Sequence, residues 1–242
     1  MAEEHDPGCL GPGEANRLLA GARWRRVVIL GDGGTERRPE RVDGYGRAPW
    51  YGRVADALRE VEPGLACLNL LSGRVRRAAD VRSRQLPEAL AFGGDLAVLR
   101  LAGHELLRPA FDAGAFRTEL VRIIAPLREH GCDVLLVDPF DLTGSAAARE
   151  LDAELVRARQ RAQTERSRTL AQLHGAVHVD PLGIPEAAPP AAPGVWSGTG
   201  LAPNGRGHAV LAAAVIRALA ARLRPAPGPQ PMDGPPDGGP RR

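Results

Sequence analysis

The sequence contains no lysine and few aromatic residues. All 32 basic side chains among the 242 residues are arginines, and aromatic residues make up only 4% of the chain. We interpret this Ala-, Arg-, Gly- and Pro-rich composition as a mark of a GC-rich genome rather than of a function. The net charge is only +3, because 29 acidic residues nearly balance the arginines, and the two kinds are interspersed. Nucleic-acid binding requires basic residues gathered on one face beside stacking aromatics, so we expect no nucleic-acid partner.

Cysteine is also scarce. Cys9, Cys67 and Cys132 form neither a C-x-x-C pair nor a zinc-binding spacing. Cys67 and Cys132 adjoin apolar, strand-like runs, so we expect core or near-core thiols there, whereas Cys9 falls in a weakly patterned segment. The sequence therefore predicts no metal and no cofactor, and it does not require an oxidising compartment.

Long hydrophobic runs are missing as well. No window approaches the roughly 18 consecutive apolar residues of a membrane span. The first residues, Met-Ala-Glu-Glu-His-Asp, are acidic and polar, and they lack the basic and apolar regions of a secretory signal. We therefore expect a cytoplasmic protein without membrane contact.

Between two Gly- and Pro-containing ends, apolar runs alternate with helical patterns. We predict a flexible tail over residues 1–22, one domain over residues 23–224, and a disordered tail over residues 225–242. Strands are expected at residues 26–30, 65–70, 96–101, 133–137 and 176–179. Helices are expected at residues 49–61, 86–92, 115–130, 146–174 (one long helix or a broken pair) and 206–223.

This alternation predicts an α/β fold, a three-layer sandwich with a parallel sheet of five strands. The apolar runs are continuous, as strands buried on both faces require. In a flavodoxin-like strand order, 2-1-3-4-5, a ligand crevice opens at the carboxyl ends of the first and third strands. The loops at residues 31–35 and 102–105 follow those two strands.

Four segments resemble sequence blocks of the SGNH/GDSL hydrolase family. Residues 27–35 (VVILGDGGT) are similar to a strand followed by Gly-Asp-Ser-x-Thr, and residues 69–74 (NLLSGR) to a block whose glycine lends an amide to the oxyanion hole. Residues 101–109 (LAGHELLRP) are similar to Gly-x-Asn-Asp followed by Leu-Leu-Arg-Pro. Residues 196–208 are similar to the last block, in which Asp-x-x-His precedes Gly-His. The resemblance covers residues 24–222 and implies the SGNH fold.

The positions that carry the family's chemistry have changed. The nucleophilic serine corresponds to Gly33, the oxyanion-hole asparagine to His104 and the aspartate after it to Glu105, while the Asp-x-x-His pair falls on Thr199 and Ala202. Glycine has no atom that can attack a carbonyl, and alanine cannot take a proton, so no acyl-enzyme can form by this route. We expect no ester hydrolysis by the family mechanism.

The surviving groups suggest other chemistry. Backbone amides of Gly33 and Gly73, with His104 in place of the asparagine, are donors that can stabilise negative charge. We expect His104 to act in acid–base work with Glu105 or Asp32 assisting, and Gly33, Gly73, Thr199 and Ala202 to contact substrate. The expected ligand is a small molecule with a carbonyl, carboxylate or phosphate, and the expected reaction is a cyclisation, elimination or isomerisation.

Several alternatives remain open from the sequence. Asp32 can serve a tight turn, and Glu105 can pair with Arg108. An active hydrolase with relocated machinery would use Ser72, Ser197 or an activated water. A third possibility is a non-catalytic partner protein whose crevice is filled by its own side chains.

Other polar residues have structural interpretations. Thr35 is expected to cap a helix, and His208 to cap or pack the last helix. Imidazolium is favourable near the helix ends where His130 and His174 lie. Asp138 and Asp180, which follow the last two strands, are expected in turns. The Pro-rich residues 185–193 are either a lid over the crevice or a surface insertion.

Overall fold

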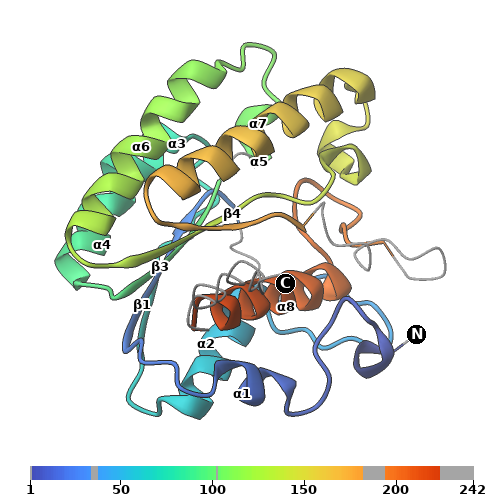
Figure 1. Ribbon diagram of the computed structural model, residues 1–242. Coiled ribbons are helices and arrows are strands. Elements are labelled where there is room, and N and C mark those ends of the chain that lie inside the picture. Colours follow the sequence, from blue (N-terminus) through green and yellow to red (C-terminus); the bar gives the residue numbers. More distant parts are fainter. Residues whose placement is uncertain (1, 34–37, 102, 182–193, 224–242) are drawn as a thin grey trace, which may run out of the picture.

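The computed structural model describes residues 2–33, 38–101, 103–181 and 194–223. It confirms the predicted α/β fold with a five-stranded parallel sheet in the order β2-β1-β3-β4-β5 (Figure 1). The strands are β1 (Arg26–Gly31), β2 (Ala66–Asn69), β3 (Leu96–Arg100), β4 (Asp133–Val137) and β5 (Val177–Val179).

Helices cover both faces of the sheet (Figure 1). One face carries α1 (Glu14–Leu19), α2 (Trp50–Val61) and α8 (Gly205–Leu223), and the other carries α4 (Leu86–Phe92), α6 (Ala113–Glu129) and α7 (Ala153–Leu173). Shorter helical segments are η1 (Glu3–His5), α3 (Ala78–Asp80), η2 (Val81–Gln85), α5 (Gly103–Leu106), η3 (Leu142–Gly144) and η4 (Ala146–Ala148).

Strand burial follows from this layering. Successive side chains of a strand point to opposite faces, so Val27 and Ile29 pack toward α8, while Val28 and Leu30 pack toward α6. Every residue of the central strand β3 is buried. Both faces of the inner strands therefore belong to cores, which explains the continuous apolar runs in the sequence.

The two long helices on the α6 face begin at capped residues. The carboxylate of Asp112 accepts the amides of Gly114 and Ala115 at the start of α6, and Asp152 does the same at the start of α7. The sequence left open whether residues 146–174 form one helix or two. The structure resolves this as the short turn η4 followed by α7.

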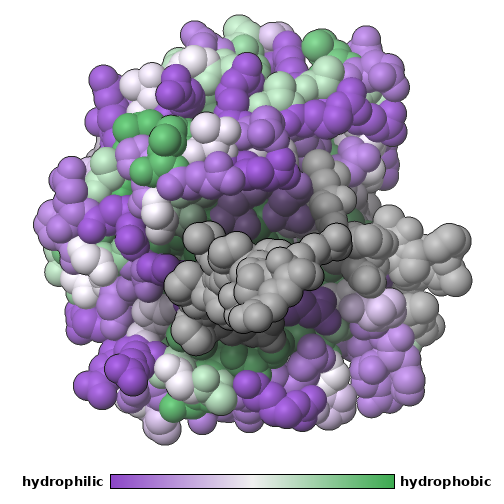
Figure 2. Space-filling model, in the orientation of Figure 1, coloured by the Kyte–Doolittle hydropathy of each residue, from purple (hydrophilic) through white to green (hydrophobic). Residues whose placement is uncertain are grey.

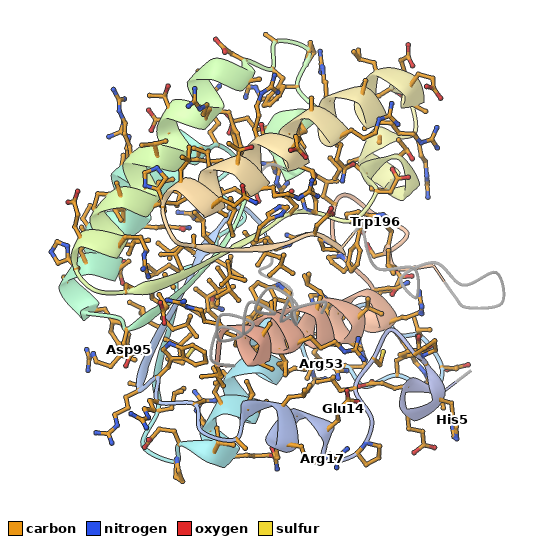
Figure 3. All side chains as sticks on the ribbon, in the orientation of Figure 1. His5, Glu14, Arg17, Arg53, Asp95 and Trp196 are labelled. Atoms are coloured by element: carbon orange, nitrogen blue, oxygen red, sulfur yellow. The ribbon has the colours of Figure 1, made fainter. Side chains whose placement is uncertain are left out.

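The predicted flexible tail over residues 1–22 is wrong for the described residues 2–22. Asp6 is buried and pairs with Arg206 of α8 at 2.7 Å, while Cys9 and Leu19 belong to the core. On α2, Arg53, labelled in Figure 3, pairs with Glu3. These partners lie far away in the chain, so the weak local pattern of the segment did not show that it packs. The predicted C-terminal tail lies outside the described residues.

The visible surface carries mostly hydrophilic side chains, with hydrophobic ones scattered among them (Figure 2). Within the described ranges, no helix combines the length and apolar character that a membrane crossing needs. Cys132 is buried and Cys67 is half-buried, as predicted.

Candidate functional site

A cavity of about 430 Å³ opens at the carboxyl ends of β1, β2 and β3. This is the edge of the sheet where open α/β folds bind ligands, and the volume suits a small molecule. Five of the seven predicted site residues line the cavity: Gly33, Gly73, His104, Thr199 and Ala202. They come from four separate segments, three loops and the short helix α5, so the fold brings together residues that are up to 169 positions apart in the chain.

Strand pairing places the two predicted amide donors next to each other. A parallel bridge joins Asp32 to Ser72 beyond the ends of β1 and β2, and Gly33 and Gly73 are the next residues along each strand. The backbones of Gly33 and Gly73 therefore lie next to each other at one edge of the cavity.

Buried Gln85 holds the bases of these two loops. Its Oε1 accepts the amide of Gly31 at 2.8 Å, and its Nε2 donates to the carbonyls of Gly31 at 3.1 Å and Leu70 at 2.7 Å. Gln85 ends the π-helical segment η2, a rare conformation that is frequent at functional sites. The sequence gives no indication of the role of Gln85, because nothing in its local pattern shows that the amide is buried against β1.

Asp32 and His104 form a hydrogen-bonded pair at the cavity. One carboxylate oxygen of Asp32, Oδ2, accepts the backbone amide of His104 at 3.1 Å and lies 3.2 Å from its ring Nδ1. The Asp32 side chain is 3% exposed and that of His104 is 23% exposed. The ring Nε2 has no hydrogen-bond partner among the described residues. A carboxylate that orients an imidazole through Nδ1 leaves Nε2 available for proton transfer.

The His104 ring lies against Gly33. A Cβ atom added to Gly33 would be 3.4 Å from Cε1 of His104, and the backbone φ of Gly33 is +77°. Residues other than glycine rarely adopt this conformation. Glycine at position 33 and histidine at position 104 therefore suit each other sterically.

Glu105, the other carboxylate expected to assist His104, points elsewhere. Its Oε2 accepts the amide of Ala78 at 2.9 Å, and it does not line the cavity. Burial is the main reason that the pKa of Glu105 is raised. It forms no ion pair with Arg108, so neither interpretation from the sequence describes its contact. Of the two candidate carboxylates, Asp32 contacts the imidazole and Glu105 anchors the start of α3.

The segment before α8 forms the opposite wall. Trp196, labelled in Figure 3, pairs with Pro203 in an isolated antiparallel bridge, and its Nε1 donates to the carbonyl of Asp141 at 2.8 Å. The hydroxyl of Ser197 donates to the carbonyl of Thr199 at 2.7 Å. This wall holds Thr199 and Ala202 at the cavity.

Neither alternative nucleophile contacts an imidazole. The Ser197 hydroxyl is hydrogen-bonded within its own loop, and Ser72 Oγ accepts the amide of Arg74 at 3.3 Å. Within the described chain no histidine is hydrogen-bonded to either serine. Activation of a serine requires such a base within reach.

Two charged residues at the cavity are not indicated by any motif in the sequence. Glu40 and Arg76 both line it. Glu40 Oε2 accepts the amide of Gly198 at 2.8 Å and so links the loop after β1 to the opposite wall. No motif or spacing singled out these residues, because only the folding of their loops brings them to the cavity.

The remaining predicted residues lie away from this cavity or outside the described chain. His208 is buried, and its Nδ1 accepts the amide of Trp50 at 3.0 Å, so it caps the start of α2 rather than its own helix.

The other residues have partners or positions elsewhere in the fold. Asp138 pairs with His178 at 2.9 Å, and Asp180 pairs with Arg168 at 3.5 Å. His130 and His174 lie at the carboxyl ends of α6 and α7, as expected. Thr35 and residues 185–193 lie outside the described residues.

Comparison with solved structures shows the same fold in several hydrolases. An alpha/beta hydrolase from the metagenome of Lake Arreo, Spain, is 19% identical with a TM-score of 0.64, over 83% of this chain and 95% of that one. A catalytic variant of an acetylxylan esterase from Geobacillus stearothermophilus is 16% identical with a TM-score of 0.63, over 83% and 94%. The lipase/acylhydrolase from Enterococcus faecalis is 19% identical with a TM-score of 0.60, over 84% and 99%.

No family model and no curated protein matches this sequence. At these identities the structural similarity shows a shared fold. Chemistry must be inferred from the site itself.

Proposed function

We propose that this chain is an SGNH-hydrolase-like protein without the serine machinery, which binds a small carbonyl-containing metabolite and converts it by proton transfer. The observation that carries the proposal is the Asp32–His104 pair at the cavity. Asp32 orients the ring through Nδ1, and Nε2 of His104 is the acid–base group. Proton transfer by a positioned histidine contributes a rate factor of about 10²–10⁴.

The surroundings of the pair support carbonyl chemistry. Gly33 and Gly73 place backbone groups at the same cavity, where an amide donor can stabilise an enolate or another developing oxyanion. Position 33 has no nucleophile, and Thr199 and Ala202 offer no base. The reaction we propose is therefore a cyclisation, elimination or isomerisation, with the proton carried by His104.

The test measures exchange of carbon-bound protons for solvent deuterium in small oxo acids by NMR. The wild-type protein should accelerate exchange, and His104→Ala should remove at least 99% of the acceleration. Asp32→Asn should also lower the acceleration of exchange, because the side-chain amide cannot hold the His104 ring as the carboxylate does. His130→Ala, at the end of α6 and outside the cavity, is the matched histidine control and should have no effect.

An esterase assay tests for the result that would contradict this proposal. Release of nitrophenol from short-chain acyl esters, abolished by a serine-directed fluorophosphonate, would establish a relocated serine hydrolase and overturn the proposal. Full exchange activity in His104→Ala would show that His104 is not the acid–base group.

A further inference from the structure

Arg76 lines the cavity, and its positive charge forms no ion pair within the described part of the protein. It lies three positions after Gly73, in the segment that follows β2, and its side chain is exposed. The described residues provide it with no hydrogen bond or ion pair. Arg53 and Arg206, by contrast, bind carboxylates of the N-terminal segment. Arg76 therefore has all five of its N–H donors available to a molecule in the cavity.

The other charges at the cavity have partners on the protein. Glu40 accepts the amide of Gly198, and Asp32 is engaged with His104. Arg100 is buried and borders a small adjoining void, which shares Gly33 and His104 with the main cavity. Among the described residues that line the main cavity, Arg76 is thus the only permanent cation.

We propose that Arg76 binds an anionic group of the ligand, a carboxylate or a phosphate, while the carbonyl of the same molecule faces His104. This inference rests on the proposed function, and it adds the ligand class. The planar guanidinium matches the two oxygens of either anion with paired hydrogen bonds. Arg76 and His104 line one cavity of about 430 Å³, so a single small molecule can reach both.

The experiment titrates the full-length protein with acetate, inorganic phosphate and neutral acetamide, followed by ¹H–¹⁵N NMR at low ionic strength. Both anions should shift signals of the cavity residues Gly73 and Ala202, and acetamide should not. Arg76→Gln should weaken anion binding at least ten-fold. Arg117→Gln, an exposed arginine on α6 outside the cavity, is the matched control and should bind as the wild type does.

Comparing the affinities of acetate and phosphate shows which anion the site prefers. Equal affinity in Arg76→Gln and the wild type, equal weakening in Arg117→Gln, binding of acetamide, or no binding of either anion by the wild type would overturn the inference. His104→Ala separates the two proposals, because it should abolish proton exchange and retain anion binding. If anion binding is independent of Arg76 but exchange still requires His104, only the role of Arg76 is lost.

Discussion

Acidification should destabilise this protein through His208. The imidazole is 1% exposed, and its Nδ1 must be unprotonated to accept the Trp50 amide. Burial, reinforced by the positive charges of Arg100 and Arg53, lowers the pKa of His208 from 6.5 to about 3. In the unfolded chain the same group takes up a proton near pH 6.5. The free energy of unfolding should therefore be highest above pH 6.5 and fall as the pH drops toward 3.

The magnitude follows from the two pKa values. Each pKa unit corresponds to about 1.4 kcal/mol, so the whole interval from 6.5 to about 3 represents about 5 kcal/mol. At pH 4.5 the expected loss from His208 is about 3 kcal/mol. Domains of this size are stable by only about 5–15 kcal/mol, so the loss should be visible in ordinary denaturation experiments.

The assay is urea unfolding followed by tryptophan fluorescence between pH 7.5 and 4.5, for the wild type and His208→Asn. The asparagine amide offers Oδ1 to the Trp50 amide and does not titrate. Other groups, including Glu105 with its raised pKa, contribute equally to both proteins and cancel in the difference. The difference in unfolding free energy should narrow by about 3 kcal/mol over this range. Parallel pH profiles would refute the reasoning.

Two further predictions concern the backbone at the site and the N-terminal segment. Gly33→Ala should cost about 1–2 kcal/mol in urea unfolding because φ is +77°, and it should shift the NMR signals of the His104 ring. Gly21→Ala, with φ of +87° and open space around it, should cost about as much and leave those ring signals unchanged, so equal shifts in both variants would contradict the proposed contact. Asp6→Asn should cost roughly 3–5 kcal/mol, because it removes the carboxylate charge that faces the buried guanidinium of Arg206. A cost below about 1 kcal/mol, typical of exposed ion pairs, would show that this pair does not anchor the segment.

The contact between Gly33 and His104 bears on how this site differs from a serine esterase. A side chain at position 33 would meet the ring that Asp32 holds. The substitution Gly33→Ser would therefore place a hydroxyl beside His104 on a strained backbone. Since Thr199 and Ala202 form the other wall, His104 is the one histidine among the described residues that line the cavity of such a variant.

Local patterns in the sequence predicted most of the fold. The apolar runs of β1 and β3 marked strands buried on both faces, and the predicted strand order is the observed one. The stripe of Leu120, Ile123 and Leu127 marked the buried face of α6. These features could be predicted because periodicity and burial are properties of neighbouring residues.

The candidate site was predictable only in part. Block spacing pointed to Gly33 and His104, which line the cavity together. It could not show which carboxylate contacts the imidazole, because Asp32 lies 72 positions from His104, whereas Glu105 is its neighbour in sequence. It also gave no indication of Arg76.

The sequence by itself determined the layer architecture and the strand order, and it predicts that this chain lacks the catalytic serine, histidine and aspartate of the family that it resembles. The tertiary structure alone decided the pairing of Asp32 with His104, the burial of Asp6 against Arg206 and the role of His208 as a cap for α2. The physical reason is distance along the chain. Secondary structure follows from patterns over a few residues, whereas these contacts join groups 72 to 200 positions apart, which only the packed fold brings within hydrogen-bonding range.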